Sequence, residues 1–130
     1  MAYQGEYFRN RCGEAATRHT PPIKEMLQAG LPVGAGTDAT RVASYNPFVS
    51  LYWLVTGKTV GGLRMYDSSN RLGRMEALRL WTVGSSWFST EEGRKGSIVP
   101  GQLADLAVLS AHRCQQQQMK SGFGCLCWAF

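Results

Sequence analysis

Apolar residues recur at helical spacing in three stretches of the chain. In the first, Ile23, Met26 and Leu27 fall at positions i, i+3 and i+4, which places them on one face of a helix. Thr20 precedes two prolines and is the expected N-cap, while Gly30 follows the last periodic residue. The pattern therefore predicts a helix that begins at the prolines and ends before Gly30.

Two further helices are predicted downstream. Asn46 and Pro47 form a cap and a first-turn proline, and Gly57 marks the end of the apolar pattern that follows them. Residues 58–70 are rich in glycine and polar side chains and are expected to form a loop. A third apolar stripe at helical spacing predicts one continuous helix over residues 74–88.

Short apolar runs between these helices predict strands. Residues 31–35, LPVGA, suit a buried parallel strand with Pro32 at its start, where no ladder donor is needed. Residues 96–99 and 103–109 are expected to form two strands around a Pro-Gly turn. Helix, glycine and strand in this order indicate an α/β fold class.

Composition limits the kind of protein without assigning a function. A chain of 130 residues with 44% hydrophobic residues is expected to form a single globular domain rather than a disordered segment. No apolar run approaches the ~20 residues of a membrane span, and the first ten residues do not resemble a secretory signal. A cytoplasmic protein is expected, and its length lies below the roughly 200 residues that a complete eight-fold α/β barrel needs.

The net charge of +5 does not indicate a nucleic-acid-binding surface. Arg113 and Lys120 supply +2 of it within the last twenty residues, and no block of five or six like charges occurs elsewhere. A surface that follows phosphates needs clustered rather than dispersed basic residues. We therefore expect neither a nucleic-acid partner nor a membrane partner.

The last twenty residues differ in character from the rest. They hold a run of four glutamines and three of the four cysteines, Cys114, Cys125 and Cys127. The C-x-C spacing fits no standard zinc site, and the cysteines lie among bulky apolar residues. A poorly ordered extension rather than a metal site is the expectation for residues 111–130.

Residues 34–38, GAGTD, are the segment that carries candidate chemistry. They come directly after the predicted strand, and functional side chains collect at the C-terminal ends of parallel strands. Asp38 could bind a metal or act as a general base there. Spacing alone leaves a second interpretation open, in which Asp38 caps the next segment or anchors a turn through its own backbone.

Four motifs in order carry a resemblance to a known family. AGLPVGAGTDATRVASYNP, VSLYWLVTG, RMEALRLWT and GSIVPGQLADLAVLS resemble the C-terminal part of the amidohydrolase superfamily, in the branch of N-substituted formamide deformylases. The resemblance implies an incomplete (β/α)₈ barrel: residues 1–95 would be its C-terminal portion and residues 96–110 a segment of the small β-sandwich. Residues 111–130 would be a non-family tail, explained by a shifted reading frame.

The same resemblance implies a metal-dependent hydrolase of amide-type, non-peptide C–N bonds in small molecules. A divalent metal, zinc above all, is the implied cofactor, and Asp38 matches the residue that binds it or takes the proton from metal-activated water. Arg41 could hold a substrate carboxylate bidentately, or pair with an acid on the barrel rim.

Most metal ligands of that family have no counterpart here. The two histidines, His19 and His112, lie outside any H-x-H pair, and His19 is expected at the surface. A catalytic zinc needs about three protein ligands, so Asp38 alone would not hold it tightly. We expect a truncated form that is inactive alone and associates with itself through exposed barrel faces; the alternative is a non-catalytic remnant that acts only through a partner.

Overall fold

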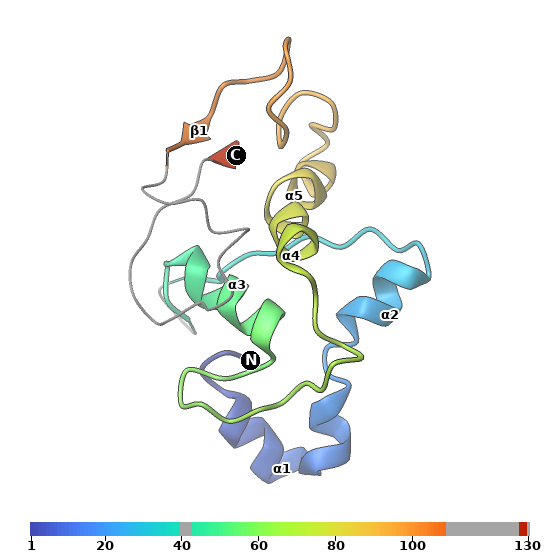
Figure 1. Ribbon diagram of the computed structural model, residues 1–130, viewed down its shortest axis with the longest axis vertical. Coiled ribbons are helices and arrows are strands. Elements are labelled where there is room, and N and C mark those ends of the chain that lie inside the picture. The colour runs from blue at the N-terminus through green and yellow to red at the C-terminus, as the bar shows by residue number, and fades with distance from the viewer. Residues whose placement is uncertain (40–42, 109–127, 130) are drawn as a thin grey trace.

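The computed structural model describes residues 1–39, 43–108 and 128–129, and most of its regular structure is helical (Figure 1). β1 and β2 pair antiparallel, with Leu106 opposite Ala129. The elements in chain order are α1 (Gly5–Arg18), α2 (Ile23–Gln28), α3 (Pro47–Thr56), α4 (Arg74–Trp81), α5 (Val83–Phe88), β1 (Leu106–Ala107) and β2 (Trp128–Ala129).

α3 forms where its sequence predicts it. The side-chain oxygen of Asn46 accepts a hydrogen bond from the amide of Phe48 at 2.9 Å, and Pro47 occupies the first turn. Gly57 ends the helix in the left-handed region, with φ of 67°, and its amide donates to the carbonyl of Trp53. Both ends are thus fixed by local residues.

α2 ends as predicted but begins differently. Gly30 has φ of 72°, and its amide donates to the carbonyl of Leu27 while the amide of Leu31 donates to Met26, a paired arrangement that closes a helix at glycine. The prediction of Thr20 as N-cap is wrong. The N-cap position is Pro22, because two prolines separate Thr20 from the first helical residue.

The predicted continuous helix over residues 74–88 is two helices. Thr82, with φ of −110° and ψ of −91°, separates α4 from α5. The carbonyl oxygen of Leu80, which would continue the helix ladder, accepts instead from the amide of Ala35 at 2.9 Å. A crossing segment has therefore replaced a helical hydrogen bond, which is a recognised cause of a break.

The predicted parallel strand over residues 31–35 does not form. A strand needs a neighbouring strand for its ladder, and the described residues supply none beside this segment. Leu31 is 50% exposed rather than buried. The segment instead runs past the junction of α4 and α5 on its way to α3 (Figure 1).

The predicted pair of strands around Pro100 is confirmed only in its turn. The amide of Gln102 donates to the carbonyl of Val99, and Gly101 has φ of 91°, as a turn with proline then glycine requires. The amide of Leu103 then donates to the carbonyl of Arg94 rather than pairing with residues 96–99. The predicted hairpin of two strands is therefore wrong. The strand that forms here is β1, and its partner is β2.

α1 is an element that the sequence patterns did not predict. Its 14 residues lack a sustained apolar face, and Gly13 interrupts it with φ of 83°. Long-range bonds hold it in place: the hydroxyl of Thr59 donates to the carboxylate of Glu6, and the amide of Val60 donates to the carbonyl of Ala2. Such contacts are invisible to local periodicity.

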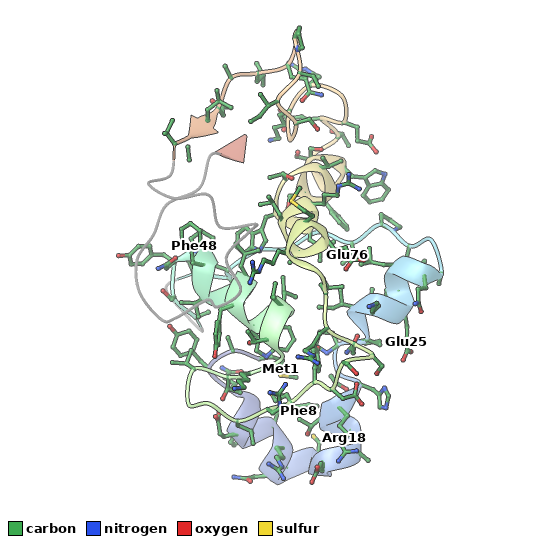
Figure 2. All side chains as sticks on the ribbon, in the orientation of Figure 1. Met1, Phe8, Arg18, Glu25, Phe48 and Glu76 are labelled. Carbon is green, nitrogen blue, oxygen red and sulfur yellow. The ribbon has the colours of Figure 1, made fainter. Side chains whose placement is uncertain are left out.

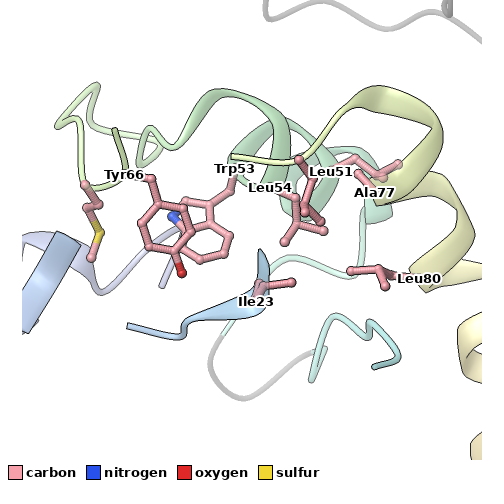
Figure 3. Packing of buried hydrophobic residues seen from close by; sticks show 9 residues of the cluster. Ile23, Leu51, Trp53, Leu54, Tyr66, Ala77 and Leu80 are labelled. Atoms are coloured by element: carbon pink, nitrogen blue, oxygen red, sulfur yellow. The ribbon is translucent and has the colours of Figure 1, made fainter. Parts of the chain in front are cut away.

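The buried hydrophobic side chains pack into one cluster (Figure 3). Its buried members are Ile23, Leu51, Trp53, Leu54, Met65, Tyr66, Leu72, Ala77 and Leu80. Among residues 83–108 the buried positions are Ser86 and Gly96. The described residues are thus a helical unit around a small core and do not themselves form a barrel.

Candidate functional site

Asp38 lies at the end of the extended segment that follows α2. Its side chain is exposed, and its φ of 50° places it in the left-handed region. Aspartate adopts this conformation more readily than most residues with a side chain. A strained polar residue of this kind is found more often at functional sites than elsewhere, so the backbone geometry agrees with the candidate role without assigning it.

The segment that leads to Asp38 is attached at Ala35. The amide of Ala35 donates to the carbonyl of Leu80 at 2.9 Å, and its carbonyl accepts from the hydroxyl of Ser85 at 3.0 Å. That hydroxyl also lies 2.9 Å from the carbonyl oxygen of Leu80. Both backbone groups of Ala35 are therefore engaged at the junction of α4 and α5.

Two glycines allow the segment to approach this junction. A Cβ built on Gly84 would clash with the carbonyl oxygen of Val33, and one built on Gly34 would lie 2.9 Å from the ring of Phe88. Larger residues at either position would push the segment away from α5. Gly36, by contrast, has open space around it.

The described residues do not fit a metal centre. No group of three His, Cys, Asp or Glu side chains comes together in residues 1–39, 43–108 and 128–129. His19 is exposed near α2, where its Nδ1 lies 3.6 Å from the carboxylate of Glu25. Asp38 is thus a single carboxylate without a neighbouring ligand set in this part of the chain.

Arg41 was the candidate for substrate binding, and it lies outside the described residues. The same holds for His112, Cys114, Cys125 and Cys127. Cys12, in α1, is exposed with a free thiol.

A group of charged side chains lies on α1, with Arg18 at the end of this helix (Figure 2). Glu14 pairs with Arg18 at 2.7 Å and with Arg9 at 3.1 Å, and the hydrogen bond from Arg18 is the main cause that lowers the pKa of Glu14. A shallow hollow is lined by Glu14, Ala15, Arg18 and His19. These charges pair with one another at the exposed surface, where solvent hydrates the remaining polar atoms.

Ser85 and Gly84 were missed as members of the candidate site. The stripe of apolar residues on either side of them predicts an uninterrupted helix and hides the break. A glycine followed by serine inside a helical pattern is a common position for a kink, and this signal was available in the sequence. It would have located the junction, although not its contact with Ala35.

The sequence matches the amidohydrolase family over residues 1–121, which is nearly the whole chain. The chain belongs to the amidohydrolase family, whose members are hydrolases that generally use divalent metals.

One curated relative is similar at the level of sequence. The chain is 30% identical over 88 residues to an N-substituted formamide deformylase of Arthrobacter pascens, a match that covers 68% of this chain. It spans only 16% of the length of that relative. No solved structure matches the chain. Within the described residues, none of the helices has the length and apolar character that crossing a bilayer requires.

Proposed function

We propose that this chain corresponds to the C-terminal portion of a metal-dependent amidohydrolase that cleaves amide-type, non-peptide C–N bonds of small molecules. The observation that carries the proposal is the family match over residues 1–121. The deformylase that it resembles acts on N-substituted formamides, and we take this substrate class as the first one to test.

Asp38 is the side chain that we assign to the reaction. It follows a glycine-rich segment, it is exposed, and its backbone is held in an uncommon conformation. We assign it the role of a metal ligand or a proton acceptor in the assembled enzyme, with zinc as the expected metal. Since one carboxylate does not build a metal centre, the remaining ligands have to come from polypeptide outside the described residues.

Arg41 is our second assignment, as a group that binds a carboxylate of the substrate. Its position three residues after Asp38 supports this role, because the planar guanidinium donates two parallel hydrogen bonds to a carboxylate. An Arg41→Lys variant would keep the charge and lose that paired geometry.

The alternative proposal is a non-catalytic role through association. Large apolar side chains are exposed throughout residues 83–108, among them Trp87 at 46% and Ile98 at 69%. Exposed apolar surface of this kind usually marks a contact with another chain. Under this alternative the chain would associate with a partner or with itself without hydrolysing anything.

Complementation tests the catalytic proposal. The chain would be co-expressed with the part of the A. pascens deformylase that precedes the matched region, and hydrolysis of an N-substituted formamide would be measured with added zinc. We expect no hydrolysis by the chain alone and measurable hydrolysis by the complex. Asp38→Asn keeps the left-handed backbone accessible and should lower the rate of the complex at least ~100-fold, the usual contribution of an acid–base group.

Asp67→Asn is the matched control, since Asp67 is an exposed carboxylate whose hydrogen bonds are to Ser69 of its own loop. It should leave the rate unchanged. Full activity of the Asp38→Asn complex would contradict the assignment of Asp38. Stoichiometric zinc retained by the purified chain alone would contradict the claim that its ligand set is incomplete.

A further inference from the structure

The carbonyl oxygen of Leu80 is the point at which the candidate segment and the helices meet. In a continuous helix this oxygen would accept from the amide of Gly84, four residues on. It accepts instead from the amide of Ala35 and from the hydroxyl of Ser85, both at 2.9 Å. The break between α4 and α5 and the attachment of the segment therefore share one acceptor.

The hydroxyl of Ser85 lies between two carbonyl oxygens. It is 3.0 Å from that of Ala35 and 2.9 Å from that of Leu80. Since a hydroxyl has a single hydrogen, that hydrogen is shared between the two acceptors. Threonine would keep this hydroxyl, whereas alanine and glycine have no side-chain donor for either oxygen.

The close contact between Gly84 and Val33 is a second, steric constraint on the position of the segment. A Cβ at Gly84 would overlap the carbonyl oxygen of Val33, so the segment can lie this close only because position 84 is glycine. Val33 and Ala35 are two residues apart, and their carbonyl groups point to the same side in extended chain. Contacts at both residues fix which residues of the segment face α5.

We propose that Ser85, supported by Gly84, is a positioning residue that sets the register of residues 33–38 and thereby the place of Asp38. A slip of the segment by one residue would move Asp38 by about 3.3 Å, which is more than a metal ligand or a proton acceptor tolerates. The effect of this positioning on catalysis rests on the role proposed above for Asp38. The attachment of the segment by Ser85 is independent of that role.

Amide hydrogen exchange of the full-length chain tests the positioning directly. In Ser85→Ala we expect the amide of Ala35 to exchange about fivefold to tenfold faster, because a shared hydrogen bond beside it is lost. Ser85→Thr keeps the hydroxyl, so the amide of Ala35 should exchange at the wild-type rate in this variant. Ser89→Ala is the matched control, since the hydroxyl of Ser89 bonds within its own turn to the carbonyl of Ser86 at 3.1 Å.

The amides of α3 report whether a variant remains folded, and their exchange should be the same in all three variants. The backbone amide resonances of Thr37 and Asp38 should shift in Ser85→Ala and in Gly84→Ala but not in Ser89→Ala. Unchanged exchange at Ala35 in a folded Ser85→Ala variant would overturn the proposal. If Ser85→Ala does not fold, failure of Ser85→Thr to retain wild-type exchange would overturn it equally.

Activity separates this inference from the proposed function. In the complemented enzyme, Ser85→Ala should lower kcat with little change in KM, and Ser85→Thr should restore it. Loss of Ala35 protection without any hydrolytic activity in any complex would refute the proposed function and leave the positioning role intact. Full activity of a Ser85→Ala complex despite faster exchange at Ala35 would refute the claim that Ser85 sets the place of Asp38 and leave the hydrolase intact.

Discussion

Tyr66 is fully buried, and its hydroxyl donates to the carbonyl oxygen of Pro21 at 2.6 Å. The side-chain amide of Asn70 donates to the same oxygen at 3.0 Å, and the ring of Trp53 lies 4.6 Å from that of Tyr66. This residue therefore joins the chain before α2 to the loop after α3. Burial is the main cause that raises the pKa of Tyr66 well above its usual value of about 10.

The raised pKa of Tyr66 predicts a loss of stability at alkaline pH. A tyrosine that binds its proton more tightly when folded contributes its full stability below pH ~10 and loses it as the pH rises above that value. The free energy of unfolding should fall above pH 10 by up to ~1.4 kcal/mol per pH unit more than in Tyr66→Phe. Urea denaturation between pH 8 and 11 measures this difference.

Tyr66→Phe should also cost ~1 kcal/mol at neutral pH, because it leaves the bond to Pro21 unmade. Tyr7→Phe is the control, since Tyr7 is 66% exposed. Loss of its hydroxyl should change neither the stability at neutral pH nor the decrease in stability above pH 10. If the free energy of unfolding fell equally steeply above pH 10 in the wild type and in Tyr66→Phe, groups other than Tyr66 would cause the loss of stability.

The candidate site was predictable at the residue level only in part. Asp38 and its glycines stand next to one another in the sequence, so a motif reveals them. Ser85 lies 50 residues from Ala35, and the contact between them depends on how α4 and α5 cross the segment. No periodicity records such a crossing, which is why the residue that holds the segment was missed.

At the scale of elements, the limits of a helix could be predicted where residues next to its ends cap it. α3 has a capping side chain, a first-turn proline and a left-handed glycine, and it forms within its predicted limits. The predicted strand at residues 31–35 and the continuous helix at 74–88 failed for the opposite reason. Each outcome depends on a distant segment, a missing ladder neighbour in one case and a competing donor in the other.

The cap of α3 allows a quantitative prediction. Asn46→Ala removes the acceptor for the amide of Phe48 and should lower the free energy of unfolding by ~1 kcal/mol. Asn46→Asp keeps an acceptor at this position and should retain most of the wild-type stability. Thr20→Ala is the control, because no side chain caps α2, and it should cost less than ~0.5 kcal/mol. Thermal denaturation of the three variants measures the effect, and equal costs at both positions would contradict the difference in capping.

At the scale of the whole molecule, apolar residues are divided unevenly. The buried ones lie between Ile23 and Leu80, whereas residues 83–108 expose most of theirs. The exposed large apolar side chains in this part are Val83, Trp87, Phe88, Ile98, Val99, Leu103, Leu106 and Val108. A chain with this distribution is expected to associate in solution.

Self-association is therefore predicted for the purified chain, and it should depend on concentration. Trp87→Ser and Ile98→Ser should each weaken it about tenfold or more, because burying one large apolar side chain contributes ~1.5–3 kcal/mol. Tyr45→Ser is the control: Tyr45 is 81% exposed but precedes α3, outside this surface. Sedimentation equilibrium measures the effect, and a monomer at every concentration would contradict the prediction.

The attachment of the candidate segment to α5 has a consequence for the assembled protein. The segment that leads to Asp38 is held at Ala35 by Ser85 of α5, a helix in which Ser86 is the buried residue, so the order of the segment depends on that helix. Any chain that covers residues 83–108 would stabilise α5 and, with it, the arrangement around Asp38. By thermodynamic reciprocity, a ligand that orders Asp38 would strengthen that association by the same factor. Substrate affinity and subunit affinity would then be two measurements of a single coupling free energy.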